Sequence, residues 1–459
     1  MFHKETYQKR RERLSNDLES GLILMLGNNY VGMNYAANTY PFRQDSNFLY
    51  FFGLDKAGLA AIIDVDNNNT ILFGHNPTID DIVWEGQVPG ISDLAASCGV
   101  EQTEDPSTLS TYITKALKAG QKVHFLPPYR NANIIRLADL LGQSVESIKT
   151  GASVPLIYAV AAQRSIKSQE EIKEMTEAVN VTRAMHIAVM KGAKAGVKEA
   201  ELAGLAQQIA YAQGNGLAYP VILSKDGQTL HNHYHGNILQ EGQLVLGDFG
   251  AQNSMCYAGD ITRTCPVSST FTAVQKSIYE IVLKAEVDSI NACKAGVKYK
   301  DVHLDAAKII SAGLKDLGLM KGNVDEAVAA GAHALFFPHG LGHHIGLDVH
   351  DMEDLGEQYI GYDEETQRSD QFGTKYLRLG KRLEKGNVIT VEPGIYFIPE
   401  LIDKWHGEGM HKDFINYDAL ESFKNFGGIR IEDNILINDT DSTILGDPIP
   451  KTISEIESL

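Results

Sequence analysis

The spacing of apolar and polar positions predicts alternating helices and strands over the first part of the chain. Residues 4–19 have the pattern of a charged helix. The apolar run GLILMLG that follows, at 21–27, is short and bounded by glycine, as buried strands are. A helical pattern also covers residues 133–142. Further strands of the same sheet are predicted at 46–53, 60–66, 70–74 and 122–126. This part of the chain is therefore predicted to be an α/β domain.

Longer helical patterns begin in the second part of the chain. Ser168 is followed by Glu170 and Glu171, which is the pattern of a helix N-cap with an acidic first turn, and it predicts a helix that ends near Met190. We place the domain boundary just before this helix. Residues 1–160 are then the first domain and residues 161–459 the second. Further helices are predicted at 198–213, 271–293 and 300–318.

Two strand-like runs in the second domain each carry an aspartate. LVLGDF includes Asp248 and MCYAGDITRT includes Asp260, with turn residues between the runs as in a hairpin. Antiparallel pairing can place both carboxylates on one face, where a cation between them would relieve their repulsion. Aspartate is also a common turn residue, so the alternative is that both simply end strands.

Histidines are concentrated in FPHGLGHHIGLDVHD, residues 337–351, which we call the histidine loop. Its glycines predict irregular backbone, which can bring imidazoles to one point. Because neutral imidazole binds borderline metals, the loop is a candidate metal site. The alternative is a set of glycine turns that carry solvated histidines. The histidines of the loop are His339, His343, His344 and His350.

Two later strands place charges among apolar residues. In VITVEPGIYF, Glu392 interrupts an apolar run directly before a proline, where extended backbone is favoured, and a buried carboxylate there needs a partner. In GGIRIEDNILI, the alternation places Arg430 and Glu432 on one strand face. The hydrophilic residues 352–383, which precede both strands, are predicted to be a surface excursion with some helix.

The strand carboxylates and one imidazole form a set suited to two divalent ions. Oxygen-rich ligation with one nitrogen and no thiolate favours manganese, cobalt, iron or zinc. Two such ions about 3.5 to 4 Å apart can bridge a water, lower its pKa and polarise a carbonyl oxygen, which implies hydrolysis. The remaining histidines and Arg430 suit oxyanion binding, proton transfer and carboxylate orientation. The predicted ligands are Asp248, Asp260, His343, Glu392 and Glu432.

Composition narrows the class of protein. The formal net charge is -18, from 41 Lys and Arg against 59 Asp and Glu. A chain with this excess of negative charge is not expected to attract nucleic acid or an anionic membrane. The N-terminus is polar, and no apolar run approaches the roughly twenty residues of a membrane span. We expect a cytoplasmic protein with no nucleic-acid or membrane partner. The four cysteines lack a CxxC pair and are expected to be buried free thiols.

Together the motifs resemble those of the proline-specific metallopeptidases of the pita-bread fold, the group that contains aminopeptidase P and prolidase. HYHGN, LVLGDFG, YAGDITRT, HGLGHHIGLDVHD, VEPGIYF and GGIRIEDN occur in that group's order and spacing, and YPFRQDSNFLYFFG resembles its N-terminal domain. The resemblance implies an α/β N-terminal domain and an α+β pita-bread catalytic domain with pseudo-twofold symmetric halves. The N-terminal domain would narrow the cleft and mediate assembly into a homodimer or homotetramer.

The resemblance also implies roles for individual residues. Asp260 and Glu432 would bridge two metal ions, usually manganese in this family. Glu392 would be the general base, and Arg430 would face a ligand carboxylate. Contacts with the substrate, the transition state or the proline pocket are implied for His233, His339, His350 and Tyr396. The histidines that match no functional position, and are expected behind the site or on the surface, are His231, His235 and His344.

The implied activity is hydrolysis of the bond between an N-terminal residue and a following proline by a metal-bridging hydroxide. Peptides with proline at the second position would be the substrates. Prolidase, which accepts only the dipeptide, is a close alternative, because YFIPELIDKW resembles both enzymes. A metal-free binding module or a creatine-type hydrolase on the same fold is disfavoured because all five ligands are present. The N-terminal domain disfavours methionine aminopeptidase.

Overall fold

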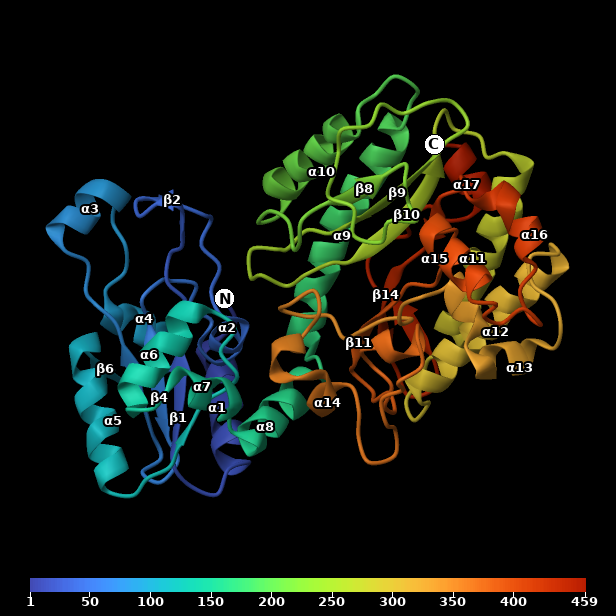
Figure 1. The fold of residues 1–459 in the computed structure, drawn as a ribbon. Helices are drawn as coiled ribbons and strands as arrows, with labels where there is room; N and C mark the ends of the chain where they lie inside the picture. Colours follow the sequence, from blue (N-terminus) through green and yellow to red (C-terminus); the bar gives the residue numbers. More distant parts are fainter. The chain divides into compact units, whose positions relative to one another are not determined.

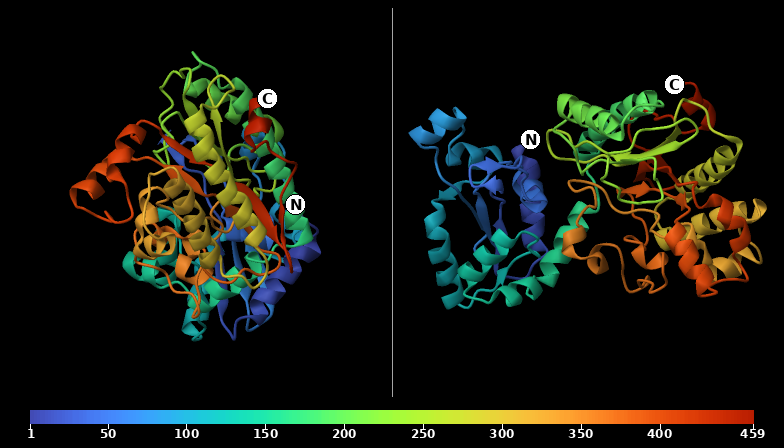
Figure 2. Two further views of the ribbon diagram at one scale, coloured as in Figure 1. Left: turned by 90° about the vertical axis from the view of Figure 1, so that its right-hand side faces the viewer. Right: turned by 45° about the horizontal axis from the view of Figure 1, so that its top comes forward.

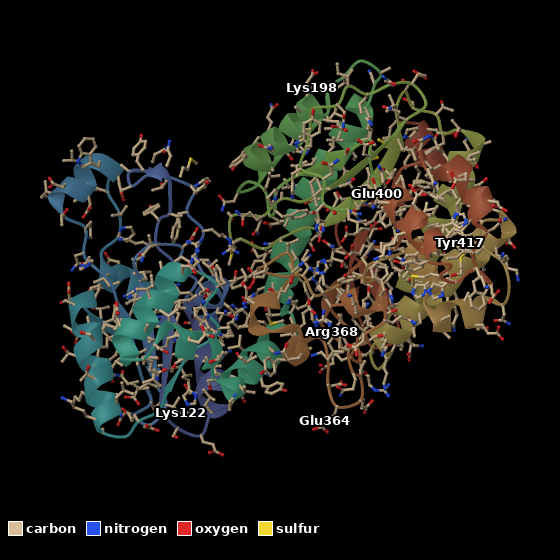
Figure 3. All side chains as sticks on the ribbon, viewed as in Figure 1. Lys122, Lys198, Glu364, Arg368, Glu400 and Tyr417 are labelled. Atoms are coloured by element: carbon tan, nitrogen blue, oxygen red, sulfur yellow. The ribbon has the colours of Figure 1, made fainter.

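The chain divides into two compact units in the computed structural model, which describes residues 1–459 (Figure 1). The first unit contains Met1–Arg164 and Met352–Ile360, and the second contains Ser165–Asp351 and Gly361–Leu459. Side chains fill the space between the helices and strands of each unit (Figure 3). None of the helices is both long enough and apolar enough to span a bilayer.

A five-stranded sheet forms the centre of the first unit. Its strands are β1 (Leu22–Leu26), β4 (Ala60–Asp64), β5 (Asn69–Phe73), β6 (Gln102–Glu104) and β7 (Val123–His124), in the order β6-β5-β4-β1-β7. Strands β1, β4 and β5 pair antiparallel, whereas β7 pairs with β1, and β6 with β5, in parallel. Successive side chains of a strand point to opposite faces, and β1 is apolar throughout because both faces of the sheet are covered.

Helices cover this sheet on both sides. The helices of one face are α5 (Leu109–Lys118), α6 (Asn131–Leu141) and α7 (Val145–Thr150), which share an apolar core with β1, β4 and β5. Helices α1 (Lys4–Asn16) and α2 (Ser46–Phe52) contact β4 and β1 and cover the other face. The predicted α/β domain is therefore confirmed.

The strand predicted at 46–53 is wrong, because these residues form helix α2. The Asp45 carboxylate accepts a hydrogen bond from the Phe48 amide, and Gly53 ends the helix in the left-handed region, at φ 67°. Nearly every side chain of the helix is buried. A short apolar run without a polar face has no periodicity that separates helix from strand.

The second unit repeats one arrangement, a pair of helices beside antiparallel strands (Figure 2). The first half comprises α9 (Gln169–Gly192), α10 (Glu199–Gln213), β8 (Ile222–Ser224), β9 (Leu244–Phe249) and β10 (Ile261–Pro266). The second half comprises α11 (Ala273–Ala292), α12 (Tyr299–Asp316), β11 (Val388–Val391), β12 (Gly394–Tyr396), β13 (Gly428–Arg430), β14 (Asp433–Ile437) and β15 (Ser442–Ile444). The predicted helices and the hairpin of β9 and β10 are confirmed.

Local signals in the sequence explain the start of this unit. The Ser168 hydroxyl accepts a hydrogen bond from the Glu171 amide, and the Glu171 carboxylate accepts one from the Ser168 amide, so α9 begins with the predicted cap. All four cysteines are buried free thiols, as expected.

Each of the two later strands is broken where it carries a carboxylate. Glu392 and Pro393 separate β11 from β12, and Ile431 and Glu432 separate β13 from β14. At the first break, proline has no amide hydrogen to donate to a sheet. At the second break, the Glu432 amide donates to the Thr262 carbonyl, at 3.1 Å. The sequence predicted two continuous strands. The breaks direct both carboxylates into the space between the halves.

The surface excursion predicted at 352–383 is divided between the units. Its first part contains the short helices η3 (Glu353–Leu355) and α14 (Glu357–Ile360) and belongs to the first unit. The rest is a loop of the second unit on which Glu364 and Arg368 are exposed (Figure 3).

Candidate metal centre

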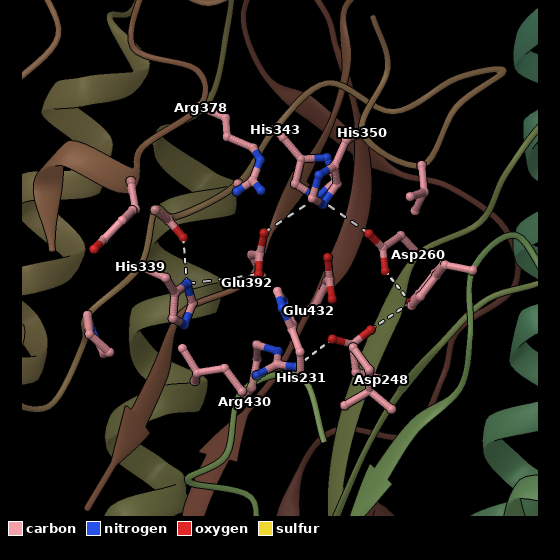
Figure 4. A pocket seen from close by; sticks show the side chains of 18 of the residues that line it. His231, Asp248, Asp260, His339, His343, His350, Arg378, Glu392, Arg430 and Glu432 are labelled. Atoms are coloured by element: carbon pink, nitrogen blue, oxygen red, sulfur yellow. Dashed lines mark hydrogen bonds and ion pairs between the residues drawn. The ribbon is translucent and has the colours of Figure 1, made fainter. Parts of the chain in front are cut away.

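The five predicted ligand side chains meet in one cavity of about 610 Å³ in the second unit (Figure 4). Asp248 lies on β9, Asp260 directly precedes β10, and His343 comes from the histidine loop. The two broken strands supply the two glutamates. All the ligands therefore come from the ends of strands or from a loop held between them. The cavity is lined by Asp248, Asp260, His343, Glu392 and Glu432, among other residues.

His343 stands at the centre of the acidic side chains. Its Nε2 lies 3.4 Å from Asp260 Oδ2 and 3.6 Å from Glu392 Oε1. Asp260, His343 and Glu432 each offer a ligand atom, and these atoms lie within 4.8 Å of one another. Glu432 Oε2 accepts a hydrogen bond from the Thr262 hydroxyl at 2.7 Å, whereas its Oε1 is buried without a hydrogen-bond partner.

Burial and mutual repulsion hold protons on this cluster. Burial, together with the charges of Asp260 and Asp248, raises the pKa of Glu392 to about 7. The same causes raise the pKa of Glu432 well above its ordinary value. Burial also raises the pKa of Asp248, against the opposing charge of Arg430. Carboxylates that cannot all ionise together, with one buried oxygen unpaired, fit a divalent cation as the missing partner.

Arg430 provides the fixed positive charge of the site. Its guanidinium donates to the Asp248 carboxylate through Nη2, to the Tyr396 hydroxyl through Nη1 at 2.8 Å, and to the Thr262 hydroxyl through Nε at 3.1 Å. It therefore faces a predicted ligand carboxylate, as the resemblance implied. It also joins the two halves of the unit, since Asp248 and Thr262 belong to one half and Tyr396 to the other.

His339 and Tyr396 differ in their access to the cavity. His339 lines the cavity, and its Nε2 lies 2.8 Å from the Tyr396 hydroxyl. Burial and the nearby charge of Arg430 lower the pKa of His339 to about 3, so the ring is neutral. Tyr396, which we expected to contact substrate, is fully buried behind His339 and does not line the cavity. Its hydroxyl instead links His339 to Arg430, because a buried hydroxyl requires partners.

The other histidines fall into two groups. His233 and His350 line the cavity, as expected, and the His350 ring lies 4.1 Å from that of His343. His231 also lines the cavity, which corrects the expectation that it lies behind the site or on the surface alone (Figure 4). His344 is buried without a hydrogen-bond partner for either ring nitrogen, and His235 does not line the cavity.

Three polar residues of the site were missed from the sequence. The Tyr219 hydroxyl lies 2.6 Å from the Asp248 carboxylate and also contacts the Asp260 carboxylate, so it links the two aspartates. The Thr262 hydroxyl links Arg430 to Glu432. Arg378, from the excursion, lines the cavity beside His343 and His350 (Figure 4). A tyrosine or threonine beside apolar residues carries no charge, so it lacks the signal by which the buried carboxylates were predicted.

Comparisons with known proteins agree with this geometry. Residues 173–439 match metallopeptidase family M24, and residues 7–125 match the aminopeptidase P N-terminal domain. The chain is 31% identical to the human Xaa-Pro dipeptidase over 98% of this chain and 91% of that protein. It is 33% identical to a probable Xaa-Pro aminopeptidase of Sordaria macrospora over 96% and 91%. Aminopeptidase P of Escherichia coli, solved with the inhibitor Pro-Leu, matches with a TM-score of 0.80 and 28% identity, over 100% and 98% of the two chains.

The fold and the site define a metal-dependent peptidase with a pita-bread catalytic domain. The chain belongs to metallopeptidase family M24 and carries the N-terminal domain of aminopeptidase P. Membership of this family implies divalent metal ions, and the buried cluster of Asp260, His343 and Glu432 is suited to hold them.

Manganese binding is expected to release more protons at pH 6 than at pH 8. In the metal-free protein Glu392, with a pKa of about 7, holds its proton at pH 6 and has mostly lost it at pH 8, and ligation requires the ionised form. The pKa of His343 is also raised, because the hydrogen bond that its ring donates to Asp260 acts against the effect of burial, and this works in the same direction. Calorimetry in two buffers of different ionisation enthalpy measures the release. Glu392→Gln should reduce the difference in proton release between the two pH values. Equal proton release at pH 6 and pH 8 in the parent protein would contradict the expectation.

Proposed function

We propose that this protein hydrolyses the peptide bond between an N-terminal residue and a following proline, with two divalent ions held by the five predicted ligands. The observation that supports this most is the convergence of four carboxylates and one imidazole, from both halves of the unit, in one cavity. The family assignment supports a peptidase. Manganese is the proposed metal, and cobalt, zinc or iron are alternatives.

When bound, the ions would polarise the substrate carbonyl and lower the pKa of a water toward neutrality. Asp260 and Glu432 are proposed to contribute to holding both ions, because their ligand atoms lie within 4.8 Å of each other and of that of His343. Glu392 is proposed as the general base. Its carboxylate lines the cavity with Oε1 3.6 Å from His343 Nε2, a position from which it can take a proton from the attacking water and release it again.

The histidines of the cavity are proposed to act on the substrate. His233 and His350 line the cavity, where an imidazole can donate a hydrogen bond to a developing oxyanion or pass a proton to the leaving proline nitrogen. His339 also lines the cavity, but its Nδ1 lies 2.8 Å from the Gly340 carbonyl and its Nε2 2.8 Å from the Tyr396 hydroxyl, so it is proposed to form a wall of the proline pocket. Arg430 is proposed to hold Asp248 ionised and oriented. Tyr396 supports His339 and Arg430 through its hydroxyl.

The walls of the cavity suit proline. An Xaa-Pro bond has no amide hydrogen and its proline φ is fixed, so a site for it needs a shaped apolar wall in place of a backbone acceptor. Part of the cavity wall is apolar and lies beside His339, and it is proposed to hold the pyrrolidine ring. The apolar side chains of this wall include Pro338, Phe372, Tyr376, Ile398 and Leu401.

The proposed activity is tested with metal-stripped protein on Gly-Pro and Gly-Pro-Ala, with and without added manganese. We expect manganese-dependent cleavage of Gly-Pro-Ala for an aminopeptidase. Cleavage of Gly-Pro alone would make the protein a dipeptidase. Failure of manganese to support cleavage of either peptide would contradict the proposed function.

One observation favours the dipeptidase as a second candidate. Arg378 lines the cavity on the side opposite Arg430, and a guanidinium there can pair with the free carboxylate of a bound dipeptide (Figure 4). The carboxylate of a tripeptide lies one residue further from the scissile bond. A site that uses Arg378 in this way would therefore prefer dipeptides.

Arg378→Met is expected to lower kcat/KM for Gly-Pro by about 10- to 100-fold, the range of a charge-assisted hydrogen bond, with a smaller effect on Gly-Pro-Ala. Steady-state kinetics with both peptides measures the difference. Arg368→Met is the matched control, because Arg368 is an exposed arginine of the same loop. An equal decrease in kcat/KM for both peptides would show that Arg378 does not bind the free carboxylate of the dipeptide.

We further propose that the chain forms a homodimer or homotetramer through its first unit. Large apolar side chains are exposed on two projecting elements, α3 (Ile79–Glu85) and β2 (Gly32–Tyr35), which lie at the same end of the unit (Figure 1). Trp84 is 85% exposed, Ile79 is 75% exposed and Tyr35 is 64% exposed. Apolar residues gathered in this way are typical of a protein interface.

Replacing Trp84 and Ile79 together with serine is expected to lower the mass of the particle to that of the single chain. Light scattering coupled to size-exclusion chromatography measures the mass. Tyr211→Ser removes an exposed aromatic residue of the second unit, 62% exposed, and should leave the mass unchanged. An unaltered mass in the double variant would exclude this surface as the interface.

A cytoplasmic location is proposed as well. Four buried thiols without a disulfide are typical of a reducing compartment. Cell fractionation followed by detection of the protein tests this proposal, and recovery from an oxidising compartment would contradict it.

A further inference from the structure

A buried ion pair lies behind the histidine loop. The Lys167 ammonium is 2.8 Å from Asp351 Oδ2, and each side chain is only 1% exposed. Neither residue lines the cavity. Moving a lysine and an aspartate out of water costs desolvation free energy, and their attraction rarely offsets this cost in full. Such a pair is therefore expected to add little to the stability of the fold. Its contacts with the loop point to another role.

Asp351 closes the histidine loop on itself. Its amide donates to the His344 carbonyl at 2.9 Å, and one carboxylate oxygen accepts a hydrogen bond from the Asp348 amide at 3.2 Å. The carboxylate packs so closely on Gly346 that a Cβ there would come within 2.5 Å of it. The conformation of the loop therefore depends on where the Asp351 carboxylate is held.

The same closure fixes the predicted ligand His343. The His344 carbonyl that accepts from the Asp351 amide also lies 2.9 Å from His343 Nδ1. A proton on Nδ1, donated to this carbonyl, leaves Nε2 free to bind metal and directs it toward Asp260 and Glu392. His350, the neighbour of Asp351, lies over the His343 ring. Asp351 thus helps to place two histidines of the site.

Lys167 is itself attached to the segment that leads to Glu392. Its amide donates to the Gly386 carbonyl at 2.8 Å, and the Asn387 side chain donates to the Ser165 carbonyl at 3.0 Å. Both contacts lie just before β11. Ser165 is the first residue of the second unit, and Asp351 is the last residue before the chain leaves that unit. The ion pair therefore joins the segment that begins at Ser165 to the segment that ends at Asp351.

We propose that Lys167 is a positioning residue for the metal centre. By neutralising the buried Asp351 carboxylate, its ammonium holds the histidine loop closed, with His343 hydrogen-bonded to the His344 carbonyl and His350 over the His343 ring. This inference rests on the proposed function. Without the ammonium, the buried carboxylate loses the cation that balances its charge, and the closure of the loop is weakened. Residues that orient a metal ligand in this way typically contribute about 10- to 100-fold to metal affinity or activity.

The test compares Lys167→Met with the parent chain. Calorimetric titration of the stripped protein with manganese is expected to show an affinity about 10- to 100-fold lower, and kcat for Gly-Pro-Ala or Gly-Pro should fall more than KM rises. Lys167→Arg keeps the charge and should recover most of the affinity. Asp351→Asn, which removes the charge with little change of shape, should also lower the affinity, and it replaces Lys167→Met if that variant fails to fold.

Leu314→Ala separates positioning from general stability. Leu314 is fully buried in α12, and its truncation opens a cavity while it leaves the Lys167–Asp351 pair and the hydrogen bonds of Asp351 in place. It should lower Tm while manganese affinity stays within twofold of the parent. A Lys167→Met protein with parental affinity and kcat would overturn the inference alone, as would a Leu314→Ala protein with the same loss of affinity. A parent chain that binds no manganese would overturn the proposed function and the inference with it.

Discussion

Replacement of Asp260 with asparagine is expected to abolish high-affinity manganese binding at one or both positions and to lower kcat by about 10³-fold or more. The carboxylate lies 3.4 Å from His343 and next to the Tyr219 hydroxyl, so the substitution removes a charge from the centre of the cluster. A metal ion contributes several kcal/mol of transition-state stabilisation, and each 1.36 kcal/mol is tenfold in rate. Calorimetry and steady-state kinetics on the same sample measure both effects.

The fold should survive this substitution. The Asn434 side chain accepts a hydrogen bond from the Asp260 amide at 3.0 Å and donates one to the Asp260 carbonyl at 2.6 Å, so the backbone is held independently of the carboxylate. Asp439→Asn is the matched control, because the Asp439 side chain is 67% exposed on the same unit. Asp260→Asn protein that binds as much manganese as the control, and turns over as fast, would show that Asp260 is not a ligand.

The second large effect is expected at Arg430. Arg430→Met should lower the free energy of unfolding of the metal-free protein by about 3–5 kcal/mol, because it leaves the buried Asp248 carboxylate without its partner cation. The loss should be smaller in the manganese-loaded protein, since bound metal supplies positive charge to the same carboxylates and stabilises the folded state. Urea unfolding of the stripped and the loaded protein measures the two values.

Arg430→Lys distinguishes charge from shape at this position. A lysine keeps the charge but lacks the planar group that reaches Asp248, Tyr396 and Thr262 together, so part of the stability should return while the link to Tyr396 is lost. An equal loss for Arg430→Met in the stripped and loaded proteins would contradict the electrostatic explanation. The loss would then reflect packing of the arginine stem alone.

Much of the fold could be predicted because local sequence patterns are enough to define many of its helices and strands. The capping box at Ser168 and the apolar runs of β1, β4 and β9 each define an element without help from distant residues. Helix α2 could not be predicted, since its side chains are buried on all sides. The breaks after β11 and β13 depend on hydrogen bonds to other segments, which no local pattern records.

The candidate ligands could be predicted for a different reason. A carboxylate within an apolar strand must have a partner, and Asp248, Glu392 and Glu432 all have this pattern. Residues such as Tyr219 and Arg378 could not be found this way, because they lie in loops whose position depends on the tertiary fold. The local sequence around Tyr396 does not record whether this strand residue faces the cavity or the core, because either orientation fits a strand beside the site.

The most direct test measures bound manganese and peptide hydrolysis together while metal-stripped protein is titrated with manganese. We expect no hydrolysis of Gly-Pro or Gly-Pro-Ala before manganese is added, and a rate that rises until two ions are bound per chain. Hydrolysis by the stripped protein in the presence of a chelator, at the rate of the loaded protein, would contradict a metal-dependent peptidase.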